Sequence, residues 1–349
     1  MRILVTGGAG FIGSAVVDEL VNDGHDVIVV DALLDRAHRV PPAYLNPGAT
    51  YLVGDLADET VATNAVRGID ALSHQASLVG LGVNFGDVVD YVHHNDQATA
   101  VLLKALHDRN FTGRIVLASS MVIYGEGTFR CARHDVVNPR ARTSARLDAG
   151  HFEPTCPLCH AELVPEPVDE SAPSDPRNIY AATKLHQEHL CAVYGREHDA
   201  PVIALRYHNV YGPRMPRDTP YAGVAAIFRS ALERGDAPRV FEDGGQRRDF
   251  VHVSDVARAN IAALRAETEV RGAFNVASGQ PHTVLELADA LRHAVGGHGP
   301  APEVTGSYRL GDVRHIFASP ARATEMLGFS ATVSFDDGVR DFATSRLRD

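Results

Sequence analysis

The amino-acid sequence predicts an α/β fold with a doubly wound parallel sheet, followed by a smaller C-terminal α/β lobe. Two observations support this prediction. Apolar runs of strand length alternate with helix-length segments through the first two thirds of the 349 residues, and glycines fill the turn between the first strand and the first helix. In such sheets ligands bind beyond the carboxyl ends of the strands, so the functional residues are expected there.

The expected elements follow the chain in order. Strands are expected at Ile3–Thr6, Asp26–Asp31, Thr50–Gly54, Ala71–His74, Arg114–Ser119 and Val202–Arg206, and helices at Ser14–Asn22, Val92–Asp108 and Ile179–His198. After Arg206 the alternation loosens, with a strand-rich stretch at Val240–Val253 and a helical one at Thr283–Ala294. We therefore divide the chain into a first domain, residues 1–206, and a smaller lobe, residues 207–349, some segments of which return to the sheet.

The glycine-rich turn lies in the opening run MRILVTGGAGFIGS and contains Gly7, Gly10 and Gly13. Such a turn lets the backbone approach a pyrophosphate, and the N-terminus of the following helix offers unpaired N–H groups to the anion. Asp31 closes the second expected strand, where a carboxylate suits the ribose hydroxyls of NAD and repels the extra phosphate of NADP. Residues 1–206 are therefore predicted to form a Rossmann domain that binds NAD.

Composition narrows the class of protein. A net charge of −11 makes nucleic acid an unexpected partner, and no apolar run is long enough to span a bilayer. Four cysteines in a chain of this length do not suggest a disulfide scaffold, and no signal peptide precedes the first strand, which starts at the second residue. A cytoplasmic enzyme with neither a nucleic-acid nor a membrane partner is therefore expected.

Tyr180 and Lys184 lie one turn apart on a predicted helix, so that both side chains share one face. A lysine ammonium beside a phenol, together with the positive nicotinamide ring, favours the phenolate and lowers the pKa of the tyrosine. Ser119 and Ser120 end a predicted strand that points at the same crevice, where a hydroxyl can bind a substrate alcohol or carbonyl. Ser120, Tyr180 and Lys184 are therefore the predicted catalytic residues.

Ordered motifs along nearly the whole chain, outside one insertion, resemble those of a known family. They are TGGAGFIGS with Asp31, GDL at 54–56, HQAS at 74–77, HN at 94–95, SSMVIYG at 119–125, YAATK at 180–184, RYHNVYGP at 206–213, RDFVHV at 248–253 and RLGDVR at 309–314. On these motifs the chain resembles the extended short-chain dehydrogenase/reductases, and within them the nucleotide-sugar epimerase/dehydratase group. The resemblance implies NAD as the coenzyme and a dTDP- or UDP-linked sugar as the substrate.

The resemblance also implies site residues, position by position. Ser120 and Tyr180 would face the sugar, while Lys184 would bond the nicotinamide ribose and tune Tyr180. The implied coenzyme contacts are Gly7, Gly10, Phe11, Ile12, Gly13, Asp31, Asp55, Leu56, Gln75, Ala76, Ser77, Asn95, Ser119, Tyr180, Lys184, Tyr207 and His208. The implied substrate contacts are Ser120, Met121, Val122, Asn209, Arg248 and Arg309, of which the last three would hold the diphosphate.

The residues after Ser120 bear on the reaction. By resemblance, 4,6-dehydratases carry an Asp-Glu pair where this chain has Met121 and Val122, and related decarboxylases keep a Glu at the second position. Because Met and Val cannot supply a proton, we favour a 4-epimerase, which oxidises carbon 4 to a ketone and returns the hydride to the opposite face. The apolar pair favours a deoxysugar such as that of dTDP-L-rhamnose. A 4-dehydrogenase, a 4,6-dehydratase and an NAD-sensing regulatory protein stay as alternatives.

Two further expectations concern recognition. The walls that would select the sugar and the base lie near Leu78–Phe85, Met121–Ile123 and Tyr211–Tyr221. The helical segments Val92–Asp108 and Ile179–His198 would pair across a two-fold axis as a four-helix interface, as in the resembling enzymes. A homodimer is therefore expected.

The segment Thr128–Pro167 breaks the alternation with polar, aperiodic sequence and is interpreted as an insertion. It contains a Cys-x2-His pair and a Cys-x2-Cys pair, which together can complete a closed, tetrahedral Cys3His site for structural zinc. The alternative is that the thiols are free, and a redox role is less favoured because no thioredoxin-like context surrounds them. His151 and His160 are alternative fourth ligands. The predicted zinc ligands are Cys131, His134, Cys156 and Cys159.

Overall fold

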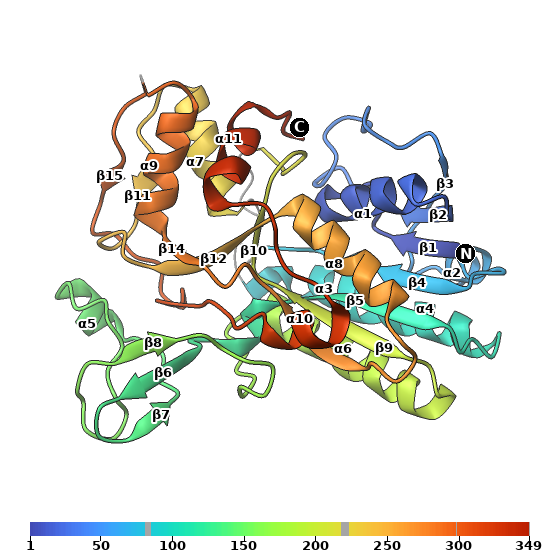
Figure 1. Ribbon diagram of the computed structural model, residues 1–349, viewed down its shortest axis with the longest axis horizontal. Coiled ribbons are helices and arrows are strands. Elements are labelled where there is room, and N and C mark those ends of the chain that lie inside the picture. The colour runs from blue at the N-terminus through green and yellow to red at the C-terminus, as the bar shows by residue number, and fades with distance from the viewer. Residues whose placement is uncertain (81–84, 218–222, 298, 349) are drawn as a thin grey trace.

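The computed structural model describes residues 1–80, 85–217, 223–297 and 299–348. At its centre is a seven-stranded sheet in the order β13-β9-β5-β4-β1-β2-β3, in which every neighbouring pair is parallel. Helices cover both faces of this sheet (Figure 1), and the fold class predicted from the sequence is confirmed. The strands are β1 (Arg2–Thr6), β2 (Asp26–Asp31), β3 (Ala49–Val53), β4 (Ala71–His74), β5 (Arg114–Ser120), β9 (Val202–Tyr207) and β13 (Gly272–Val276).

Two apolar clusters hold the helices to the sheet, one on each face. Successive residues of a strand point to opposite faces, so Ile3 and Val5 of β1 pack in one cluster and Leu4 packs in the other. Burial on both faces explains why the strands are continuous apolar runs. The first face is covered by α1 (Phe11–Asn22), α8 (Val253–Arg265) and α10 (Ala321–Leu327), and the second by α2 (Glu59–Ala65), α4 (Ala98–His107) and α6 (Ile179–His198).

The C-terminal lobe has its own core, in which Phe228, Leu287 and Phe342 meet from three helices. Two small sheets flank these helices, while β13 from the same part of the chain lies at the edge of the central sheet. The helices are α7 (Val224–Glu233), α9 (Val284–Ala294) and α11 (Phe335–Thr344), and the strands are β10 (Asn209–Tyr211), β11 (Arg239–Val240), β12 (Arg247–His252), β14 (Pro281–Thr283) and β15 (Glu303–Val304).

The predicted insertion forms a separate small sheet in the order β7-β6-β8, seen at the lower left of Figure 1. Its apolar cluster consists of Phe129, Leu163 and the thiols of Cys131 and Cys156, with Leu147 buried separately. So small an apolar core indicates that the segment needs further interactions to stay folded. The elements are β6 (Thr128–Cys131), β7 (Asp135–Val137), α5 (Ser144–Asp148) and β8 (Val164–Glu166).

The predicted helix Val92–Asp108 is longer and less regular than expected. It begins with a 3-10 turn, η1 (Phe85–Asp87), continues as α3 (Val88–Tyr91) and passes through a π-helical turn, η2 (Val92–Gln97), before α4. Residues of η2 and η3 (Met121–Tyr124) lie beside the site described below. None of the described helices is long and apolar enough to cross a membrane.

Candidate active site

A cavity of about 420 Å³ opens at the carboxyl ends of the central strands and reaches under the C-terminal lobe. Most of the residues implied by the sequence resemblance line it together, although they come from distant parts of the chain. The predicted residues in its wall are Gly7, Gly10, Phe11, Ile12, Gly13, Asp31, Asp55, Leu56, Gln75, Ala76, Ser77, Ser119, Ser120, Met121, Tyr180, Lys184, Tyr207, His208 and Asn209.

The glycine turn forms a tight backbone cradle at one end of the cavity. Gly7 has a φ of +67°, and a Cβ atom on Gly13 would lie 2.1 Å from the carbonyl oxygen of Gly7. Gly10 is the N-cap of α1 and has no side chain to cap the helix. The first N–H groups of α1 therefore have no capping side chain, and their residues line the cavity. This arrangement fits a pyrophosphate group.

Two carboxylates line the same end of the cavity as the glycine turn. Asp31 accepts hydrogen bonds from the backbone N–H groups of Ala9 and Leu33, each at 2.9 Å, and these bonds fix its side chain at the end of β2. Burial favours a higher pKa for Asp55, but hydrogen bonds from Ala57 and His93 outweigh it and hold the pKa below its usual value. The carboxylate oxygens of both residues are hydrogen-bond acceptors, suited to ribose hydroxyls and to an adenine amino group.

Ser120, Tyr180 and Lys184 meet at the other end. Burial raises the pKa of the Tyr180 hydroxyl to about 12, opposed only by a hydrogen bond with Ser120. Lys184 donates to the carbonyl oxygen of Ala118 at 2.8 Å, and its ammonium lies 5.9 Å from the centre of the Tyr180 ring. Burial also lowers the pKa of Lys184 to about 7. Without the coenzyme, burial dominates the pKa of Tyr180; the predicted lowering also requires the positive nicotinamide ring and stays a prediction.

A buried hydrogen-bond network supports these residues from behind. Ser119 donates to Glu188, whose carboxylate also pairs with Arg206 at 2.9 Å. Tyr207 receives a hydrogen bond from Asn260 at 2.8 Å and donates to Gln75 at 3.2 Å. Because Ser119 and Tyr207 are held by these hydrogen bonds, few other rotamers are open to their side chains in the cavity wall.

Asn95, an implied coenzyme contact, lies behind the wall and not in it. Its side-chain oxygen accepts from Ser77 at 3.0 Å and from the backbone N–H of Leu78 at 2.6 Å. Its amide nitrogen donates to the carbonyl oxygen of Leu78 at 3.1 Å and to Thr183 at 2.9 Å. With its hydrogen-bonding capacity used inside the protein, Asn95 ties the loop after β4 to α6.

Three of the implied substrate residues also stay outside the wall of the cavity. The guanidinium of Arg248 donates to the backbone carbonyls of Val313 at 2.7 Å and Arg314 at 2.9 Å, so it braces the lobe. Arg309 stacks on Phe241, with 5.3 Å between the guanidinium and the ring centre. Val122 follows Met121 in η3 but is not in the wall. Of the recognition walls expected near Leu78–Phe85 and Tyr211–Tyr221, residues 81–84 and 218–221 lie outside the described part of the chain.

Basic side chains that were not among the implied contacts also line the cavity. Arg36 and His38 follow β2, His94 lies on η2, and Arg348 comes from the last described turn of the chain. A histidine pair beside Asn95 was visible in the sequence. Nothing near Arg348 in the sequence pointed to the cavity.

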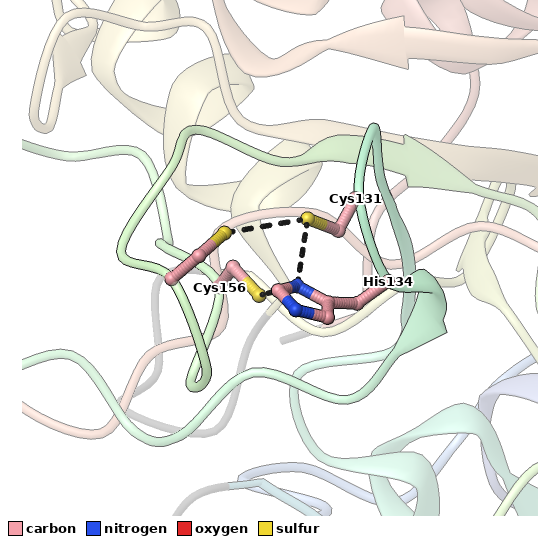
Figure 2. A group of neighbouring side chains, drawn as sticks. Cys131, His134 and Cys156 are labelled. Atoms are coloured by element: carbon pink, nitrogen blue, oxygen red, sulfur yellow. Dashed lines mark hydrogen bonds between the residues drawn. The ribbon is translucent and has the colours of Figure 1, made fainter.

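The four predicted zinc ligands come together in the insertion. Their side-chain sulfur and nitrogen atoms all lie within 4.8 Å of one another, and the histidine in this group is His134, not His151 or His160. Figure 2 shows Cys131, His134 and Cys156 pointing toward one another, with the Nδ1 atom of His134 3.5 Å from each of the two sulfurs. The sulfurs of Cys131 and Cys159 are 3.7 Å apart. The backbone N–H of Arg133 helps to lower the pKa of the Cys131 thiol to about 6.

A Rossmann domain with a glycine cradle, a strand-end serine and a Tyr-x3-Lys pair in one cavity defines an NAD-dependent short-chain dehydrogenase/reductase. The model of the NAD dependent epimerase/dehydratase family matches residues 3–144 and 159–277, and the chain belongs to this family. The break in this match falls inside the insertion. The family predicted by resemblance is therefore confirmed.

Individual relatives extend over nearly the whole chain. The chain is 32% identical to the dTDP-L-rhamnose 4-epimerase of Burkholderia thailandensis, over 98% of this chain and 94% of the relative. The UDP-glucose 4-epimerase of Thermus thermophilus, solved in complex with NAD, has a TM-score of 0.77 at 31% identity, over 98% of both chains. The UDP-glucose 4-epimerase of Thermotoga maritima, solved with UDP-glucose, has a TM-score of 0.81 at 28% identity, over 98% of this chain and 97% of that one.

Proposed function

We propose that this protein is an NAD-dependent nucleotide-sugar 4-epimerase. The observation that carries the proposal is a single cavity that joins the glycine cradle and Asp31 to Ser120, Tyr180 and Lys184. NAD bound in this cavity supplies the acceptor and the donor of a hydride. Relatives that are 4-epimerases support carbon 4 of the sugar as the reacting centre.

Tyr180 is the group that exchanges a proton with the sugar. Its phenolate oxygen takes the proton of the carbon-4 hydroxyl, and its hydroxyl later returns a proton to the ketone oxygen. Ser120 binds the same oxygen atom through its hydroxyl and holds it beside Tyr180. Lys184, one turn further along α6, has its ammonium 5.9 Å from the centre of the Tyr180 ring, and with the nicotinamide ring of bound NAD it would supply the positive charge that favours the phenolate.

The wall of the cavity argues against a dehydratase. Elimination of water from the sugar needs further acid and base groups near Tyr180, and Met121 beside Ser120 supplies none. Among the described lining residues the only carboxylates are Asp31 and Asp55, which belong to the coenzyme end. Burial lowers the pKa of His208 to about 4, so this neighbour is neutral at pH 7. Epimerisation needs no group beyond those present.

We propose a dTDP- or UDP-linked deoxysugar as the substrate. Met121 gives the sugar end of the cavity an apolar patch that accepts a methyl group at carbon 5. The Burkholderia relative, which is named for dTDP-L-rhamnose, supports the same class. A net 4-dehydrogenase would use the same residues and release NADH, whereas an NAD-sensing protein would bind NAD without turnover.

The experiment that tests this function is proton NMR of the purified protein with a panel of dTDP- and UDP-sugars, without added NAD. We expect a new sugar with the inverted coupling pattern at carbon 4 and no NADH absorbance at 340 nm. A keto-sugar formed only with excess NAD, together with NADH, would instead identify a dehydrogenase. A 4-keto-6-deoxy product would identify a dehydratase, and NAD binding without any new sugar a sensor.

Two further properties complete the proposal. We propose a homodimer formed through α6 and the helices before β5, because Val89, Val92 and Val193 are exposed on these neighbouring helices. A monomer in sedimentation at micromolar concentration would contradict this assembly.

We place the enzyme in the cytoplasm, because its four cysteines are free thiols and reduced thiols persist in that compartment. Cell fractionation tests the location.

We also propose that the insertion binds one structural zinc ion. Three sulfurs and one imidazole nitrogen within 4.8 Å of one another provide the ligand number and type of a closed tetrahedral zinc site. The apolar core around them contains little beyond Phe129 and Leu163, so coordination of the metal would supply the missing stability.

Metal analysis of the purified protein tests the zinc site. We expect about one zinc per chain, and its loss from a Cys156→Ser/Cys159→Ser variant. Cys191→Ser is the matched control, because Cys191 is a buried thiol of α6 outside the cluster. A wild-type protein that contains no zinc and takes up none on titration would refute the site.

A further inference from the structure

Arg348, the last residue that the structure describes, lines the coenzyme cavity. After α11 the chain runs beside the loop that follows β10, as the red segment ending near α1 in Figure 1 shows. The backbone N–H of Arg348 donates to the carbonyl oxygen of Met215 at 3.1 Å, and its carbonyl oxygen accepts from Arg217 at 2.9 Å. The N–H of Arg214 donates to the carbonyl oxygen of Arg346, also at 2.9 Å. These bonds fix the backbone on both sides of Arg348.

The side chain of Arg348 reaches the glycine cradle. It lines the cavity beside Gly10, and its Nη1 atom lies 3.9 Å from the position that a Cβ atom on Gly10 would occupy. The guanidinium is also close enough to His38 and Tyr44 to act on the charge of both groups. Arg348 therefore lies over the N-terminus of α1.

Arg348 is half-buried, and the protein satisfies its guanidinium only in part, through a hydrogen bond donated to Tyr44. Its Nε and Nη1 atoms have no hydrogen-bond acceptor among the described residues. Asp31, a carboxylate that lines the same part of the cavity, is already bound by the N–H groups of Ala9 and Leu33. Donor atoms of a cation that are buried without an acceptor are unfavourable unless an anion completes them.

We propose that Arg348 binds the diphosphate of the dinucleotide coenzyme, opposite the N-terminus of α1, and that the segment before it acts as a strap across the coenzyme. Adjacent guanidinium nitrogens match two phosphate oxygens, and the uncapped N–H groups of α1 face the same space. The inference rests on the proposed function, because it requires a dinucleotide in this cavity. A strap of this kind suits an epimerase, which retains its coenzyme through the catalytic cycle.

The sugar nucleotide also contains a diphosphate. The position of Arg348 in the cavity distinguishes this diphosphate from that of the coenzyme. Arg348 lies beside Gly10 and close to His38, which itself is 3.9 Å from Asp31. These residues belong to the coenzyme end of the cavity, away from Ser120 and Tyr180. The diphosphate at Arg348 is therefore that of the coenzyme.

Arg348→Gln tests this inference, with Arg346→Gln as the control, since Arg346 is exposed on the same segment. We would measure the affinity of coenzyme-free protein for NAD, ADP and adenosine by calorimetry. Loss of charge-assisted hydrogen bonds should weaken NAD and ADP about tenfold or more in Arg348→Gln and leave adenosine, which lacks phosphate, unchanged. Arg346→Gln should change all three less than twofold. Arg348→Lys, which keeps the charge but not the fork, should give an intermediate loss.

The outcomes separate this inference from the proposed function. Equal NAD affinity in wild type and Arg348→Gln would overturn the role of Arg348 and leave the epimerase proposal intact. A raised KM for the sugar nucleotide with unchanged NAD affinity would also overturn it, because the diphosphate would then be that of the substrate. Failure of the wild-type protein to bind NAD would instead refute the proposed function. Thermal melting of coenzyme-free Arg348→Gln and Arg348→Lys shows whether each variant is folded.

Discussion

Lys184 is the residue at which the proposed chemistry and the stability of the fold oppose each other. Its side chain is almost completely buried, and burial lowers its pKa from 10.5 to about 7, although Glu188 and Asp96 oppose the change. We predict that Lys184→Met abolishes turnover and makes the coenzyme-free protein more stable at neutral pH. Methionine fills a similar volume and carries no charge that must be buried.

The magnitude follows from the pKa. A change from 10.5 to about 7 corresponds to about 5 kcal/mol of unfavourable charging when the lysine is protonated in both states. The variant also loses the hydrogen bond from Lys184 to the carbonyl of Ala118, which reduces this gain in stability by about 1 kcal/mol. We therefore expect Lys184→Met to be more stable than wild type by about 2 to 4 kcal/mol below pH 7.

The sign of the pH dependence is fixed by proton binding. Between pH 7 and pH 10.5 the unfolded chain holds the proton of Lys184 more tightly than the folded chain, so the stability of the wild type rises with pH across this window. The full penalty is present below pH 7 and is absent above pH 10.5. The advantage of Lys184→Met should therefore shrink steadily as the pH rises.

Urea unfolding of coenzyme-free wild type and variant at pH 6.5, 8 and 9.5, at one protein concentration, measures this difference. Lys104→Met is the matched control, since Lys104 is exposed and paired only with Asp108 on the helix surface. Its effect should be small and should not change across this pH range. A Lys184→Met variant that is no more stable than wild type at pH 6.5, or whose advantage does not change with pH, would refute the reasoning.

Three other changes have definite expected outcomes. Tyr180→Phe should lower kcat by about 100-fold or more while NAD stays bound, as absorbance of the released coenzyme shows; near-normal turnover would remove Tyr180 from the mechanism. Gly13→Ala should abolish NAD binding and cost about 1 to 3 kcal/mol in urea unfolding, because its Cβ would meet the Gly7 carbonyl at 2.1 Å, whereas Gly299→Ala, which meets only a flexible side chain, should be close to neutral. Asn95→Ala should destabilise the protein by about 2 to 3 kcal/mol through the partners it leaves unpaired, and a loss below about 0.5 kcal/mol would contradict its bracing role.

The sequence predicted the parts of the fold that depend on local patterns. The strand at Asp26–Asp31 and the helix at Ile179–His198 have the expected bounds, because each has a clear apolar pattern and a definite end. The helix expected at Val92–Asp108 differs because buried Asn95 sits in a π-helical turn, where tertiary hydrogen bonds override the ordinary helical pitch. Side-chain contacts of that kind leave no periodic signal in a single sequence.

The arginines show most clearly what a single sequence leaves undetermined. Arg248 lies in a family motif, yet its guanidinium is bound to backbone carbonyls of residues 313 and 314. Arg348 lies in no motif, yet its guanidinium reaches the glycine cradle with two donors unpaired. The difference comes from long-range packing, since Arg348 is aligned by a bridge to Pro216 more than a hundred positions earlier in the chain. The position of each guanidinium is therefore a property of the folded chain, and the binding comparison of Arg348→Gln with Arg346→Gln tests whether that of Arg348 binds the proposed diphosphate.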